Sequence, residues 1–81
     1  MAWRMKEDSL SKLIVNFKDG NTRTFWSLDW VHKESQSIDR DVGLKRLRKL
    51  VALYGSKTGV SILYNKITDE EIERYYEGIK Q

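Results

Sequence analysis

Two runs of strand-forming residues flank an Asp-Gly pair near the start of the chain, and this arrangement limits the possible folds most. Residues 11–17 read SKLIVNF and residues 22–28 read TRTFWSL, with KDGN between them. The first run alternates in part between apolar and polar side chains, and the second is rich in threonine and aromatic residues, which favour strands. Because glycine adopts positive φ without penalty, Asp19 and Gly20 predict a tight turn and an antiparallel hairpin.

Two hairpin registers fit this turn. A two-residue turn puts Ile14 opposite Phe25, whereas a three-residue turn with a bulge at Gly20 shifts the pairing by one residue. The sequence leaves both registers open. The choice decides which face of the sheet Trp26 occupies, because neighbouring residues of a strand point to opposite faces.

Residues 39–54 are predicted to form an amphipathic helix after a loop over residues 29–38. At about 100° per residue, apolar side chains gather on one side of this helix and basic side chains on the other. Asp39 is the expected N-cap, with Ser37 as the alternative, and Gly55 is placed for the C-cap. The apolar side, which we expect to face the core, consists of Leu44, Leu47, Leu50, Val51 and Tyr54.

Two further elements are expected after this helix. The run VSILYNK at residues 60–66 predicts a third strand. The final segment, ITDEEIERYYEGIKQ, predicts a second helix, because Thr68 and Glu71 fit a capping box. Its apolar residues also recur at helical spacing, at Ile72, Tyr75, Tyr76 and Ile79.

The predicted element order is therefore ββαβα, an α+β fold. A right-handed crossover through the first helix would lay the third strand beside the first and antiparallel to it. The expected sheet has three antiparallel strands in the order 2-1-3, with the crossover helix on one face. The C-terminal helix has three open positions: an edge of the sheet, its other face, or a second subunit.

The length and composition indicate one small globular domain. The 81 residues suit one small domain, 1–81, with residues 1–10 as a candidate flexible start. The chain has no cysteine, which excludes disulfides and thiolate metal sites and leaves packing to stabilise the fold. No apolar run approaches the roughly 20 residues of a membrane span, and the first ten residues lack the apolar core of a signal peptide. We expect a soluble cytoplasmic protein with no membrane partner.

Basic charge is concentrated in the middle of the chain. Residues 31–60 carry seven basic and three acidic side chains, a net charge of +4, whereas residues 61–81 carry three and five, a net charge of −2. Cations on a rigid helix can lie along phosphates without reading bases, which indicates weak, sequence-independent nucleic-acid binding. A solvated outer face and an acidic protein partner are the other interpretations. The candidate phosphate-binding residues are Lys45, Arg46, Arg48, Lys49 and Lys57.

The tryptophans are too many for a small one-sided core. Trp26 follows Phe25 directly, so the two rings must face opposite sides of a strand. One large aromatic side chain then faces away from the first helix, where it packs under the second helix or forms a surface for a partner. The candidate residues of an aromatic partner-binding surface are Trp3, Trp26 and Trp30.

No residue group has the spacing of a catalytic or metal site. The GSKTG run at residues 55–59 joins a helix to a strand, the reverse of a phosphate loop, and is better explained as a turn. His32 is the single histidine, and its neighbours Asp29 and Glu34 are a poor metal signature. The acidic residues 69–71 favour a helix N-terminus. Without a nucleophile and base, we expect no enzymatic activity, cofactor, metal or small-molecule substrate.

The segments FKDGNTRTFWS, GLKRLRKLVALYG and SILYNKITDEEIERY resemble the layout of short uncharacterised ββαβ-type proteins of bacteriophages and bacterial mobile elements. The resemblance covers residues 13–76 and transfers no catalytic or binding residue. It implies a small accessory or host-interaction protein. Together with the surplus aromatics, it favours a protein–protein interaction module whose partner is another protein or a second copy in a homodimer. Nucleic-acid binding through the helix 39–54 is the alternative.

Overall fold

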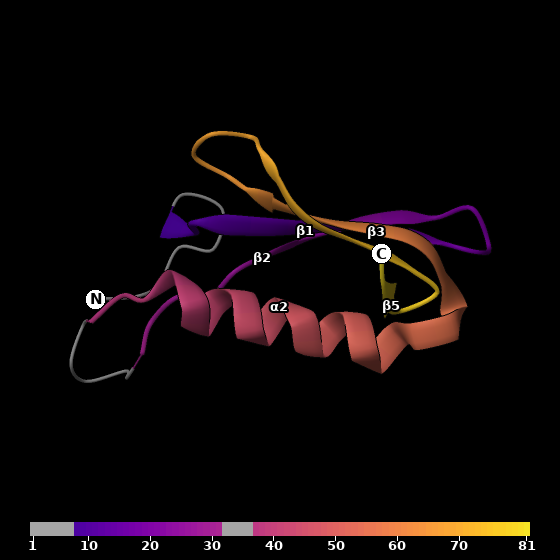
Figure 1. Ribbon diagram of the computed structural model, residues 1–81, viewed down its shortest axis with the longest axis horizontal. Coiled ribbons are helices and arrows are strands. Elements are labelled where there is room, and N and C mark those ends of the chain that lie inside the picture. The colour runs from indigo at the N-terminus through magenta and orange to yellow at the C-terminus, as the bar shows by residue number, and fades with distance from the viewer. Residues whose placement is uncertain (1–7, 32–36) are drawn as a thin grey trace.

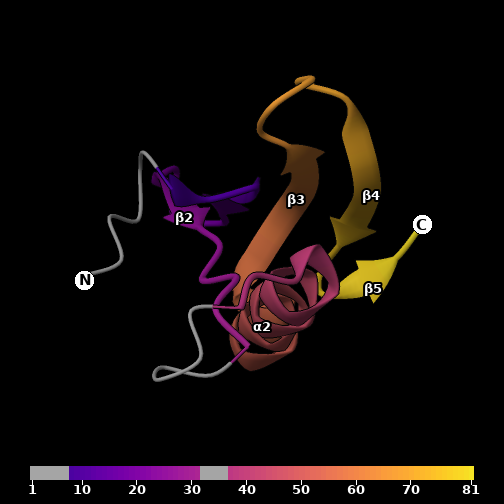
Figure 2. The same cartoon turned by 90° about the vertical axis from the view of Figure 1, so that its left-hand side faces the viewer.

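The computed structural model describes residues 8–31 and 37–81. This part of the chain forms one antiparallel sheet in the order β2-β1-β3-β4-β5, with one long helix on one face (Figure 1). Figure 2 shows the sheet curling around this helix, so that its last strand comes beside the helix. The elements are β1 (Ser11–Phe17), β2 (Thr22–Trp26), α2 (Arg40–Tyr54), a short 3-10 helix η1 (Gly55–Lys57), β3 (Thr58–Asn65), β4 (Glu71–Tyr76) and β5 (Ile79–Lys80).

The first hairpin takes the three-residue register. Ile14 pairs with Thr24, and the Phe17 N–H donates to the Asn21 carbonyl at 2.7 Å. Gly20 has a φ of 95°, the positive value that the bulge position of such a turn requires. The predicted positive φ is confirmed, and the register sends Trp26 to the face away from α2.

The connection from β2 through α2 to β3 gives the predicted strand order. Asp39 is the N-cap of α2, and its Oδ1 accepts a hydrogen bond from the Asp41 N–H at 2.9 Å. Gly55 ends the helix with a φ of 46°. β3 then lies beside β1 and antiparallel to it. The α+β class and the order 2-1-3 are thus confirmed for the first three strands.

The predicted C-terminal helix is wrong, and the sheet has five strands rather than three. Thr68 does not cap a helix, because its hydroxyl accepts a hydrogen bond from the Glu70 N–H at 3.3 Å within a loop. Asn65 organises this loop. Its Oδ1 accepts from the amides of Ile67 at 2.9 Å and Thr68 at 3.2 Å. The chain turns back at this point, and β4 pairs with β3.

A second tight turn ends β4. Glu77 and Gly78 have φ values of 52° and 83°, and they join Tyr76 to Ile79, which pair across the hairpin. Two successive residues with positive φ match the right-handed twist of a hairpin. Strand alternation therefore prevails over helical spacing in this segment, with Tyr75 in the core and Tyr76 on the opposite face.

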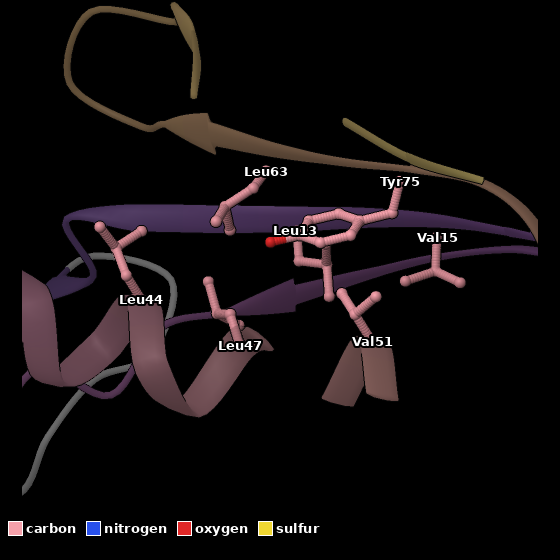
Figure 3. Packing of buried hydrophobic residues seen from close by; sticks show 7 residues of the cluster. All are labelled: Leu13, Val15, Leu44, Leu47, Val51, Leu63 and Tyr75. Atoms are coloured by element: carbon pink, nitrogen blue, oxygen red, sulfur yellow. The ribbon is translucent and has the colours of Figure 1, made fainter. Parts of the chain in front are cut away.

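One hydrophobic cluster holds α2 on the sheet (Figure 3). Leu47 is 2% exposed, as the apolar side of the helix predicts, whereas Leu50 is only partly buried against the cluster. The side chains of Phe17 and Phe25 also pack against it. The buried members are Leu13, Val15, Leu44, Leu47, Val51, Leu63 and Tyr75.

A buried polar cluster fixes the path from β2 to α2. Asp29 is fully buried, and its Oδ2 accepts from the Ser27 hydroxyl at 2.7 Å and the Leu10 N–H at 3.0 Å. The Ser9 hydroxyl donates to the Ser27 carbonyl at 2.7 Å. A β-carbon at Gly43 would lie 1.8 Å from Asp29 Oδ1. Glycine at this position therefore lets α2 approach the buried carboxylate.

Candidate interaction surfaces

The side of the sheet opposite α2 is covered by no element of the described chain (Figure 2). Because strand residues alternate between faces, the positions between the core residues define this surface. We call it the helix-free face. It carries Lys12, Ile14, Asn16, Thr22, Thr24, Trp26, Val60, Ile62, Tyr64, Arg74, Tyr76 and Ile79.

Aromatic rings and cations alternate across one end of the helix-free face. Lys12 pairs with Trp26 on one side and with Tyr64 on the other. Its ammonium lies 5.6 Å from the centroid of the Tyr64 ring, and the Lys66 ammonium lies 5.6 Å from the centroid of the Trp26 ring. At these distances a cation is attracted by the ring, so the two rings carry positive charge beside them.

The remainder of the helix-free face is apolar at its centre and aromatic toward β5. Ile14 pairs directly with Ile62, and both side chains are half-buried. Tyr76 and Ile79, which pair across the last hairpin, are 53% and 69% exposed. This surface thus retains apolar area that α2 does not cover.

Charges of both signs border the helix-free face. Lys12 Nζ lies 3.4 Å from Asp69 Oδ1, and Arg74 lies 2.8 Å from Glu71 Oε1. Exposed pairs of this kind contribute little to stability, and both partners stay within reach of solvent. The border therefore offers cations and carboxylates to whatever contacts the face.

The structure places the backbone of two of the three tryptophans predicted to form an aromatic surface, Trp26 and Trp30. Trp3 is outside the described residues. Trp26 is on the helix-free face, whereas the backbone of Trp30 lies on the helix side, where its carbonyl accepts from Arg46 at 2.8 Å. The aromatic residues that accompany Trp26 are Tyr64 and Tyr76. Sequence reasoning missed Tyr76 because it placed this residue on a helix, and the adjacent turn at residues 77–78 was the signal for a strand.

The basic residues of α2 divide into two groups. Arg46 donates to the carbonyls of Leu28 at 2.6 Å and Trp30 at 2.8 Å, and Arg48 pairs with Glu73. The side chains of the other candidate phosphate-binding residues are exposed and have no partner among the described residues. These are Lys45, Lys49 and Lys57.

Arg48, Glu73 and Tyr75 form a connected group between α2 and β4. Both the Arg48 guanidinium and the Tyr75 hydroxyl donate to the Glu73 carboxylate. Burial raises the pKa of Glu73, but the hydrogen bonds from Arg48 and Tyr75 outweigh it, and the pKa lies below its usual value. Burial and the bond to Glu73 raise the pKa of Tyr75. This group fixes the helix on the sheet and leaves Arg48 less free to bind a partner.

A shallow groove of about 450 Å³ lies between the tip of the first hairpin and the end of α2. The Phe17 and Tyr54 rings meet edge-on there, with centroids 5.2 Å apart. Asp19 already accepts from the backbone and side-chain amides of Asn21. The lining residues are Phe17, Asp19, Asn21, Thr22, Arg23 and Tyr54.

Within residues 8–31 and 37–81, no group of three or more His, Cys, Asp or Glu side chains is placed to hold a metal ion. The same residues include no helix with the length and apolar character needed to cross a membrane. Comparison of the chain with protein-family models, with curated proteins and with solved structures finds no match. The helix-free face and the basic side of α2 are the two candidate interaction surfaces of the described residues.

Proposed function

We propose that this protein is a non-enzymatic protein–protein interaction module that docks its partner on the helix-free face. The observation that carries this proposal is the apolar and aromatic surface that α2 leaves uncovered, with Trp26, Tyr64 and Tyr76 around Ile14 and Ile62. Apolar patches bordered by polar groups are typical of interaction sites. Tyrosine and tryptophan are also enriched in the cores of protein interfaces.

The mixed charge of the border favours a polypeptide partner. Lys12 and Arg74 could pair with carboxylates, and Asp69 and Glu71 could pair with cations, on a surface of complementary pattern. A polyanion would meet the two carboxylates at the same border. This contrast supports a protein partner over nucleic acid for the helix-free face.

Nucleic-acid binding through α2 is the second candidate. It is favoured by Lys45 and Lys49, which lie one turn apart, are exposed, and have no partner among the described residues. Arg46 and Arg48 contribute less to this candidate because their guanidinium groups are bonded within the protein. A role as an accessory or host-interaction protein of a bacteriophage or mobile element, as the sequence resemblance implies, fits the first candidate.

Site-specific photocrosslinking in the native cells tests the docking face. A photoreactive residue replaces Ile62, at the centre of the helix-free face, and the matched control replaces Lys49 on the outer side of α2. We expect discrete products with another polypeptide from position 62 and none from position 49. Mass spectrometry identifies the linked protein, which is then purified and titrated against the wild type and Tyr64→Ala.

We expect Tyr64→Ala to weaken this binding at least about tenfold, the loss typical of removing an aromatic hot-spot residue. Circular dichroism must show that the variant is folded. Products from position 49 alone, or equal binding of the wild type and Tyr64→Ala, would contradict docking on the helix-free face.

A further inference from the structure

The hydrogen bonds of the first hairpin determine which backbone groups of β2 remain available. The Ser27 N–H donates to the Ser11 carbonyl at 3.0 Å. Bonded and non-bonded pairs alternate along an antiparallel ladder. Phe25 and Arg23 lie two and four residues before Ser27 and also pair with β1. Their N–H and C=O groups therefore point toward β1.

The alternate residues of β2, Thr22, Thr24 and Trp26, turn their N–H and C=O groups outward. These groups have no hydrogen-bond partner among the described residues. β2 has neither a proline nor a bulge in its register with β1, two features that protect edge strands, and Arg23 is its single charged residue. The opposite edge, β5, has only two residues. β2 is therefore the edge that can accept another strand.

We infer that β2 pairs antiparallel with β2 of a second copy of this chain, about a two-fold axis through Thr24. Thr24 is the middle residue of the five in this strand, so the axis gives full overlap. Thr24 then faces Thr24 of the second copy, and Thr22 faces its Trp26. All of these are outward residues, and each pair exchanges N–H···O=C bonds in both directions.

Side-chain charge favours the same register. Arg23 falls opposite Phe25 of the second copy, and its guanidinium already lies 5.7 Å from the centroid of its own Phe25 ring. A second ring beside this cation adds attraction. A register centred on Arg23 would instead set two guanidinium groups directly opposite each other, which is repulsive.

The other registers lose hydrogen bonds. A register centred on Phe25 shortens the overlap, because β2 ends at Trp26. A register centred between two residues opposes an outward residue to an inward one, whose backbone groups already bond to β1. The axis through Thr24 is therefore the one that pairs all three outward residues by backbone hydrogen bonds and sets no like charges opposite each other.

This pairing places both copies of α2 on one side of a continuous sheet and both helix-free faces on the other, because the axis is perpendicular to the sheet. The inference goes beyond the proposed docking, since it uses backbone groups at the edge of the sheet rather than side chains on its face. The two proposed interactions are therefore independent, and an experiment can reject one of them without rejecting the other.

A single introduced cysteine reports the register, because the chain has no cysteine of its own. Thr24→Cys sets two thiols on directly opposed residues, whose Cα atoms lie about 5.5 Å apart, within disulfide range. Thr22→Cys is the matched control on the same strand and face. Its thiols would be separated by four residues, roughly 13 Å. We expect Thr24→Cys to oxidise to a linked dimer at least about tenfold faster than Thr22→Cys.

Sedimentation of variants without cysteine gives the second readout. The wild type should sediment as a dimer at about 1 mM, where even weak association is populated. Thr24→Pro removes an outward N–H, a change that an edge strand tolerates, and should sediment as a folded monomer. Tyr64→Ala, on the helix-free face, should remain a dimer.

Three results would overturn the inference: a monomeric wild type at this concentration, equal linking of the two cysteine variants, or a dimer that Thr24→Pro leaves intact. If Tyr64→Ala abolishes the dimer while Thr24→Pro does not, the two copies associate through the helix-free face. That outcome rejects the edge but supports the proposed docking surface.

Discussion

The two faces of the sheet share the same strands but differ in what covers them. Leu63 and Ile62 are neighbours on β3, yet Leu63 is fully buried beneath α2 and Ile62 is half-buried on the helix-free face. The helix side also holds the buried Asp29 cluster, whereas the helix-free face holds half-exposed aromatics and cations. Among the described residues, the packing that stabilises the fold is therefore concentrated on the helix side of the sheet.

Truncation of the two neighbours tests this difference most strongly. Leu63→Ala should lower the free energy of unfolding by about 2–5 kcal/mol, because it leaves a cavity in the core. Ile62→Ala should cost about 1 kcal/mol, since its side chain buries less apolar area. Urea unfolding followed by circular dichroism measures both. Equal losses would mean that the helix-free face is packed as tightly as the core.

The Asp29 cluster gives the second test of the helix side. Gly43→Ala adds a β-carbon 1.8 Å from Asp29 Oδ1, and this overpacking should cost about 1–3 kcal/mol. The gain of about 1 kcal/mol in helix propensity does not offset this clash. Gly59→Ala is the matched control, because its nearest contact would be an ordinary 3.7 Å. Thermal unfolding compares the two, and a stabilised Gly43→Ala would show that α2 does not lie against the carboxylate.

The sequence predicts those elements whose local signals agree. Gly20 and Asp39 each meet a specific backbone requirement, so the first hairpin and α2 could be recognised. The last segment carries conflicting signals. Its apolar residues recur at helical spacing, whereas Asn65 and Gly78 favour turns. The segment forms a strand because it pairs with the free edge of β3. β4 pairs with β3 across a short loop, and the spacing of the apolar residues within the segment does not reveal this pairing.

The candidate site was predictable only in part for the same reason. Adjacent aromatics at residues 25–26 require one ring on each face, which identifies Trp26 as a surface residue once the register is known. Tyr76 reaches the same face only because β4 is a strand. Arg46 and Arg48 contribute less to the basic surface because they bond to the β2–α2 connection and to β4. Helical periodicity does not reveal these contacts.

The pH dependence of stability also compares the two faces, through Glu73 and Glu71, with a smaller expected effect. The hydrogen bonds from Arg48 and Tyr75 outweigh the effect of burial and lower the pKa of Glu73, so its contribution to stability is present above the unfolded pKa. It is lost as the pH falls through the lower, folded pKa. Glu73→Gln should therefore reduce stability at neutral pH and flatten its decline in acid.

This effect should be less than about 1 kcal/mol, because Arg48 is partly solvated. The control is Glu71→Gln, because the hydrogen bond from Arg74 lowers the pKa of Glu71 at a more exposed pair. The stability of Glu71→Gln as a function of pH should differ less from that of the wild type than the stability of Glu73→Gln does. Urea unfolding over a pH series gives both curves, and a Glu73→Gln curve parallel to the wild type would mean that the carboxylate is not held by Arg48 and Tyr75.

The smallest effect on stability is expected on the outer side of α2. Replacing Lys45 and Lys49 together by Gln should change the free energy of unfolding by less than about 0.5 kcal/mol, because both side chains are exposed and unpaired among the described residues. Arg46→Gln is the control from the same helix. It removes hydrogen bonds to the carbonyls of Leu28 and Trp30 and should cost about 1–2 kcal/mol.

The same double variant tests nucleic-acid binding separately from folding. If α2 lies along phosphates, labelled DNA and RNA should bind the wild type with a steep loss of affinity as salt rises. The slope of log affinity against log salt should then fall by about 1.8 in the double variant, roughly 0.9 for each lost phosphate contact. An unchanged slope would place binding elsewhere on the protein. A wild type that fails to bind at low salt would remove this alternative, and Lys45 and Lys49 would then be the solvated outer side of a helix whose opposite side fills the core.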